Sequence, residues 1–392
     1  MPRILRVQGF GSEWLCIFES CASYWRTPNF KEMMCKLCKN KEADQTGAHI
    51  FNFALIREIY NPKDNKNRGK EIVYGISTKD FLNVYFGNGI QPEEIQQLKG
   101  RDLTDEEIEK NCNPFTVDNI WCRECEGKFK VLEDYFMDNL YLKLRNQNKV
   151  DNYNSSVIRL YIYSLYWRVS VTNYCNFKLS DKEESKLRSL LLYNAKGKVE
   201  ETIELAGLNS RQIKKMPLIF NYQEPQDDIT EHIILADLRR NPYLLIINNV
   251  AFQLFFKDKL GQCEKKYYFG LNDFGDFKKS INLNEEKLKI TQINKSQSKD
   301  ILNKVNFIIA KQKTSDFKKL FIETHLHFFR VFPLDELIRS FMAKLTNDRG
   351  KLAHNYSFEH FVRTMYDFFA DLAERHVEIR HITGVSASRV DE

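Results

Sequence analysis

The chain has 392 residues, with 59 Lys and Arg against 53 Asp and Glu, and so a formal net charge of +6. Its composition of 43% hydrophobic and 13% aromatic residues excludes a disordered chain and predicts a globular protein. No window approaches the roughly 20 uncharged apolar residues of a membrane span, and the modest positive charge permits nucleic-acid binding without requiring it.

Two Cys-x-x-Cys pairs are the main feature of the first 150 residues. Cys35 and Cys38 stand in CKLCKN, and Cys122 and Cys125 stand in WCRECEGKF. Each short turn presents two sulfur atoms to one ion, and four thiolates complete the tetrahedral site that Zn²⁺ prefers. A redox dithiol is disfavoured because neither pair follows a strand of a βαβ unit. The spacing predicts a structural zinc ion bound by the four cysteines.

The other cysteines and the N-terminal residues indicate a compartment. Five further cysteines remain outside the two pairs, and we expect them to be free thiols, which favours a reducing environment. The N-terminal segment MPRILRVQGFGSEW lacks the apolar core of a secretory signal. The sequence therefore predicts a cytoplasmic protein without a membrane segment.

Basic residues gather around the two cysteine pairs. They are Lys31, Lys36, Lys39, Lys41, Arg123, Lys128 and Lys130. Such a group could contact a phosphate backbone, and the alternative is an ordinary solvated basic surface.

The chain divides into three predicted blocks, of which the first is residues 1–150. Apolar positions from Phe129 to Leu144 recur at helical spacing, so the second cysteine pair is expected to open a long helix. The second block, 151–290, begins with two helices at 155–172 and 181–192, the latter capped by Ser180. Four runs rich in β-branched and aromatic residues follow and predict an antiparallel meander: 218–222, 229–237, 243–248 and 251–256.

The third block, 291–392, is predicted to be helical throughout. Apolar residues recur at helical spacing over 301–309, 317–332, 334–345 and 358–377, and Pro333 separates two of these helices. The polar stretch 282–299 is the best candidate for a linker. The predicted fold class is therefore α+β, with a zinc-stabilised N-terminal domain, a middle region of helices and antiparallel sheet, and an all-α C-terminal bundle.

His49 adds a possible chemical function to the zinc pairs. It stands in GAHIFNF, where the alternation of residues indicates a strand. A cysteine pair comes first, then a strand with a histidine, and then a second cysteine pair that opens a helix carrying Glu126 and Glu133. The order of these features resembles the HNH, or ββα-metal, nuclease superfamily. More specifically, the order is similar to that of a bacterial group of HNH-like proteins, over roughly residues 30–200. The resemblance implies a ββα-metal-like domain that hydrolyses DNA or RNA, and a role as an antiphage-defence or toxin effector.

The resemblance also assigns roles to single residues. His49 matches the general base, and Glu126 and Glu133 match positions on the helix from which a catalytic Mg²⁺ or Mn²⁺ is held; carboxylates suit such hard ions. Two residues depart from the family pattern. Ala48 precedes His49 where many HNH nucleases have an acidic residue or a second histidine, and Glu126 stands where many have a histidine. The alternative is a non-catalytic zinc-stabilised module that binds nucleic acid or a partner protein.

A second resemblance concerns the C-terminal block. Arg349 and His354, in NDRGKLAHNYSFE, match the Arg-x4-His motif of HEPN ribonucleases. In that family, arginine and histidine from paired protomers cut RNA without a metal, so the resemblance implies a homodimer with His354 as acid and base and Arg349 stabilising the phosphorane. Gly350 departs from the polar residue usual at its position, and the alternative is a helix start capped by Asn347 or Asp348. The expected partners are nucleic acid and either a partner protein or an activating ligand.

Overall fold

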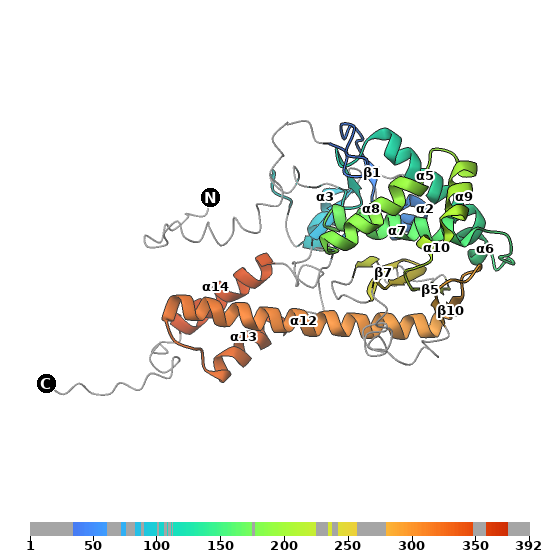
Figure 1. The fold of residues 1–392 in the computed structure, drawn as a ribbon. Helices are drawn as coiled ribbons and strands as arrows, with labels where there is room; N and C mark the ends of the chain where they lie inside the picture. The colour runs from blue at the N-terminus through green and yellow to red at the C-terminus, as the bar shows by residue number, and fades with distance from the viewer. Residues whose placement is uncertain are drawn as a thin grey trace.

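The computed structural model describes residues 34–60, 72–75, 83–87, 90–99, 102–105, 108, 111, 113–174, 177–224, 234–236, 242–256, 280–347 and 358–374. Within these residues the protein combines helices with antiparallel strands, so the predicted α+β class is confirmed. In Figure 1, helices lie on one side of the main sheet and a single long helix crosses its other side.

The first unit contains the cysteine pairs and a small antiparallel strand pair. Its elements are β1 (Ala48–His49), α2 (Phe53–Tyr60), β2 (Ile72–Gly75), β3 (Asn83–Phe86), α3 (Pro92–Lys99), β4 (Thr116–Val117) and α5 (Arg123–Phe136). Strands β1 and β4 pair antiparallel, with Ala48 opposite Val117 and His49 opposite Thr116. A strand, an antiparallel strand and a helix therefore follow one another, with α2, β2, β3 and α3 inserted between the two strands.

The helix that follows the second cysteine pair is long, as its apolar spacing predicts. Helix α5 continues through one π-helical turn, η3 (Met137–Tyr141), into α6 (Leu142–Arg145). The buried positions include Phe129, Leu132, Phe136, Leu140 and Leu144. The π turn contains one more residue than an α-helical turn. The spacing of the buried positions therefore changes by one residue at this point.

Helix α7 (Ser155–Val171) is the central element of the molecule. Every residue from Ser155 to Ser170 is buried, and Asn154 caps the helix by accepting hydrogen bonds from two backbone amides. A helix that is apolar on all sides needs cover on all sides. It is in contact with α5, α8 (Asp181–Asn194), α9 (Val199–Leu208) and α10 (Ser210–Ile213). Two arginines, Arg159 and Arg168, are nevertheless fully buried in it.

The main sheet is a meander extended at one edge. Three of the four strands predicted as a meander, β6 (Ile234–Ala236), β7 (Tyr243–Ile247) and β8 (Val250–Leu254), pair in sequence order, whereas the first predicted strand does not pair with β6. Strand β5 (Leu218–Gln223) pairs with the other side of β8, and β9 (Ile281–Asn282) pairs with one end of β5. Strand β10 (Ile290–Ile293) runs parallel to β5. The stretch predicted as a linker therefore contributes a strand, which supplies hydrogen bonds that β5 would lack as an edge strand.

One contiguous core joins the first two predicted blocks. Its buried residues run from Cys35 to Leu288. Phe136 of the α5 extension stacks on Tyr161 of α7, with ring centroids 4.2 Å apart, and also lies against Phe220 of β5. The predicted boundary at residue 150 thus falls inside a single hydrophobic cluster.

The C-terminal residues form three helices, α12 (Lys295–Phe329), α13 (Asp335–Asn347) and α14 (Phe358–Glu374). The helices predicted at 301–309 and 317–332 are one continuous helix of 35 residues. Its start lies at the sheet, where Ser298 Oγ donates a hydrogen bond to Gln223 Oε1. Its far end packs with α13 and α14 around Phe321, Phe341 and Phe368 (Figure 1). No helix in the described ranges is long and apolar enough to cross a membrane.

Candidate metal centre and adjacent acidic cluster

The four predicted cysteines meet at one point. Cys35 and Cys38 lie in a turn before β1, whereas Cys122 is the N-cap of α5 and Cys125 lies in its first turn. Their sulfur atoms all lie within 4.8 Å of one another, and Cys38 Sγ is 4.0 Å from Cys122 Sγ. Tetrahedral zinc with Zn–S bonds of 2.3 Å places sulfurs roughly 3.8 Å apart. The donor set and its spacing fit a bound metal ion such as zinc.

Proton sharing among the thiols agrees with this arrangement. A hydrogen bond from Cys125 lowers the pKa of Cys35 from its ordinary value of 9.0 to about 4. The same contact raises the pKa of Cys125, and burial raises that of Cys122. Cys35 is therefore the thiol that loses its proton most readily, whereas Cys122 and Cys125 retain theirs. A divalent cation would replace the shared protons and hold all four sulfurs as thiolates.

The backbone around the first pair is fixed by contacts from several elements. Lys39 adopts a left-handed conformation, with φ 60°, and its amide donates to the Cys35 carbonyl at 2.8 Å. The guanidinium of Arg188, on α8, donates to the carbonyls of Lys36 and Cys38 at 3.2 and 3.3 Å. The metal centre is therefore attached to the helical layer as well as to α5.

His49 lies on β1, the strand that follows the first cysteine pair. Its side chain is half-buried, and its ring is 6.1 Å from the ring of Phe53 between centroids. Its carbonyl oxygen accepts a hydrogen bond of 3.1 Å from Arg168 Nη1. The predicted strand position of His49 is thus confirmed, and a residue of α7 holds the backbone at this position.

Glu133 forms a buried ion pair with the same arginine. Its Oε1 lies 2.6 Å from Arg168 Nη1, and the side chains are 15% and 1% exposed respectively. The Arg168 guanidinium also lies over the Phe129 ring, 5.1 Å from its centroid. A buried cation needs such a partner, because an unpaired charge in the interior is strongly destabilising. The Glu133 carboxylate is therefore engaged by a protein cation.

Glu126 is half-buried in the first turn of α5. Its Oε2 is buried, and the indole N–H of the buried Trp121 interacts with the carboxylate without ideal hydrogen-bond geometry. Burial raises the pKa of Glu126, and the negative charge of Glu133 adds to this effect, whereas Arg168 and the Trp121 indole act in the opposite direction. Glu126 thus presents a desolvated carboxylate that is only weakly engaged by the protein.

The predicted catalytic residues do not form a preassembled three-ligand site. In the part of the chain that the structure describes, the four cysteines are the only group of three or more ligating side chains close enough to share an ion. The His49 carbonyl and the Glu133 carboxylate instead share Arg168 Nη1, and the charge of Arg168 acts on Glu126 without a hydrogen bond. Magnesium is commonly held by one or two carboxylates together with substrate phosphates, a role that Glu126 alone can fill. Arg349 and His354 lie outside the described residues.

Acidic residues neutralise part of the basic group around the cysteines. Lys41 and Lys128 both pair with Glu124, and Arg123 lies 3.6 Å from Asp44. The pKa of Glu124 falls to about 2 because of its hydrogen bonds with the two lysines. Two carboxylates thus offset three of these cations and reduce the local positive charge, which weakens the case for a phosphate-binding surface at this point.

A cleft of about 600 Å³ lies at the opposite end of α5, between α6 and β10. Its lining includes Arg145, Tyr153, Tyr222, Lys287 and Ile290. It contains none of the residues predicted to act in chemistry.

Arg168 is the residue of this region that sequence reasoning overlooked. A signal was present, because a charge inside the otherwise apolar run 157–171 needs a buried partner.

Comparisons with protein-family models, with curated proteins and with solved structures found no match for this chain.

Proposed function

We propose that this protein is a metal-dependent nuclease of the HNH-like type. The observation that supports the proposal is the β1–β4–α5 unit fastened by four cysteines, with His49 on its first strand and Glu126 on its helix. In this interpretation the cysteines hold structural Zn²⁺, the first domain is ββα-metal-like, and the C-terminal helices form a separate bundle. A cytoplasmic location and a role in antiphage defence or as a toxin are part of the same proposal.

The residues have distinct roles in this reaction. His49 removes a proton from the attacking water, and Glu126, together with the substrate phosphate, holds Mg²⁺ or Mn²⁺. The ion supplies charge neutralisation for the phosphodiester oxygens. Glu133 balances Arg168, so we assign it a supporting role behind Glu126.

The test is a cleavage screen of plasmid DNA and total RNA by the zinc-loaded protein. Wild type, Glu126→Gln and His354→Ala are compared with Mg²⁺, with Mn²⁺ and with EDTA. We expect cutting that needs the added ion, is lost in Glu126→Gln and is kept in His354→Ala. Cutting of RNA in EDTA that only His354→Ala abolishes would move the activity to Arg349 and His354. Absence of cutting under all conditions, with salt-sensitive binding of nucleic acid, would favour the non-catalytic module.

A further inference from the structure

We infer that Arg168 is a positioning residue, which fixes the His49 strand against the acidic face of α5. The inference rests on the proposed function for its consequence in catalysis, but the clamp itself is independent of it. One nitrogen, Nη1, donates both to the His49 carbonyl on β1 and to Glu133 Oε1 on α5. Strand β1 and helix α5 are therefore both held by Nη1 of Arg168, which belongs to α7.

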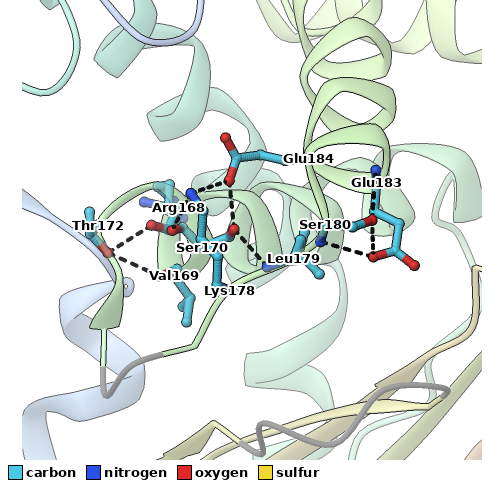
Figure 2. Close-up of polar contacts among 9 residues, drawn as sticks. All are labelled: Arg168, Val169, Ser170, Thr172, Lys178, Leu179, Ser180, Glu183 and Glu184. Carbon is cyan, nitrogen blue, oxygen red and sulfur yellow. Dashed lines mark hydrogen bonds and ion pairs between the residues drawn. The ribbon is translucent and has the colours of Figure 1, made fainter.

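The backbone from which Arg168 extends is itself held rigidly. Figure 2 shows the Thr172 hydroxyl bonded back to the Arg168 carbonyl, at 2.8 Å, at the end of α7. Just beyond, Glu184 of α8 accepts hydrogen bonds from Ser170 Oγ and from Lys178 Nζ at 2.7 and 2.8 Å. Arg168 is thus placed by two helices and has little freedom to move.

Unpartnered polar atoms surround the clamp. Nε and Nη2 of Arg168 and the hydroxyl of Tyr161 make no hydrogen bond, and Glu126 Oε2 and Trp121 Nε1 have no well-formed bond beyond their interaction with each other. Arg168, Trp121 and Tyr161 are fully buried. Buried polar groups without protein partners commonly bind ordered water. Water held between Arg168 and Glu126 would extend the clamp from Glu133 to the carboxylate that we propose as the metal ligand.

Lysine does not hold this geometry in the same way. The rigid, planar guanidinium keeps Nη1 between its two acceptors, whereas a lysine ammonium is a point charge on a flexible stem. In Arg168→Lys the charge that balances Glu133 is kept, but the simultaneous contacts with the His49 carbonyl and Glu133 are lost. The substitution therefore tests whether Arg168 positions the His49 strand, without removing the positive charge that balances Glu133.

The chain contains a closely matched control. Arg159 lies on the same helix, is equally buried and donates to two carbonyls, those of Met216 and Leu283, both at 2.9 Å. Arg159→Lys therefore has a comparable structural effect, and neither of these two carbonyls belongs to β1 or α5. Each full-length variant is characterised by its zinc content, its thermal midpoint, kcat and KM for cleavage with Mn²⁺, and amide hydrogen exchange in residues 45–52.

We expect Arg168→Lys to retain zinc, to lower kcat at least tenfold with KM within about twofold, and to speed amide exchange in 45–52. Arg159→Lys should keep the wild-type kcat and the wild-type exchange there. Equal behaviour of the two variants in both measurements would overturn the inference. If Arg168→Lys does not fold, Glu133→Gln replaces it, with the same expected outcomes. A wild type without cleavage would refute the proposed function, while the exchange rates would still decide whether Arg168 clamps β1.

Discussion

The sulfur atoms of Cys38 and Cys122 lie 4.0 Å apart although 84 residues separate them in the sequence. Between them the described residues form two short strand pairings and α2 and α3, and contribute only a few members of the buried core. A bound ion would hold the two ends of this segment together.

Loss of one of these thiols should therefore release the metal and destabilise the N-terminal unit. Zinc can contribute on the order of 10 kcal/mol to such a site, so Cys122→Ser should lose zinc and lower the unfolding midpoint sharply. Elemental analysis of the purified protein and thermal unfolding measure the two effects. Cys263→Ser, which replaces a cysteine that belongs to neither Cys-x-x-Cys pair, is the control. A Cys122→Ser protein with full zinc content would contradict the site.

The buried ion pair gives a prediction about stability. Glu133→Leu leaves the Arg168 charge without its partner and should cost about 3–5 kcal/mol, whereas Arg168→Met combined with Glu133→Leu should cost less. Urea unfolding measures both. Lys149→Met, which removes an exposed pair with Asp151 whose side chains are 86% and 40% exposed, should leave stability nearly unchanged. A double variant less stable than Glu133→Leu would contradict the pairing.

Helix α8 depends on a capping box at its start. Ser180 Oγ accepts from the Glu183 amide, and Glu183 Oε2 accepts from the Ser180 amide and from the Tyr243 hydroxyl. Ser180→Ala should thus lower the free energy of unfolding by about 1 kcal/mol. Ser189→Ala, at an exposed position within the same helix, should have little effect. Chemical denaturation of both variants tests the difference, and equal stabilities would refute the role of the cap.

His325 makes the stability of the C-terminal helices sensitive to pH. Burial lowers its pKa, although a hydrogen bond with the Val331 carbonyl acts in the opposite direction. As pH falls, His325 is protonated in the unfolded chain first, near pH 6.5. Its contribution to stability is therefore fully present above that pH and is lost as pH falls towards the pKa of the folded state.

We therefore expect a flatter decline in stability between pH 7 and pH 5 in His325→Gln than in wild type. Unfolding followed by helical circular dichroism at each pH measures it. His327→Gln, at an exposed position two residues away, should keep the wild-type decline. The prediction fails if both variants show the same pH profile.

Short-range patterns in the sequence predicted local structure well. Cysteine spacing predicted the four-cysteine cluster, because two knuckle turns are a specific arrangement. Helical spacing predicted the burial of Phe129, Leu132 and Phe136, and Ser180 marked the start of α8. In each helix, and within each cysteine pair, the residues that determine the structure are close together in the sequence.

Long-range pairing was harder to predict. The polar run around β10 contains few apolar residues, and only its place beside β5 makes it a strand. The continuity of α12 was missed because its two halves pack on different partners, the sheet and the C-terminal helices, which breaks the single apolar stripe. Arg168 could be predicted to need a partner, but nothing local in the sequence identifies Glu133 and His49 as that partner.

The most direct test of the proposed chemistry is single-turnover cleavage of a supercoiled plasmid and of a labelled RNA with Mn²⁺. It compares wild type with His49→Ala and with His327→Ala as a surface-histidine control. Loss of a general base lowers rates by roughly 10²–10⁴-fold, so His49→Ala should lose at least about a hundredfold while retaining zinc, and His327→Ala should cut at the wild-type rate. Cleavage by His49→Ala at the wild-type rate would contradict a catalytic site on β1.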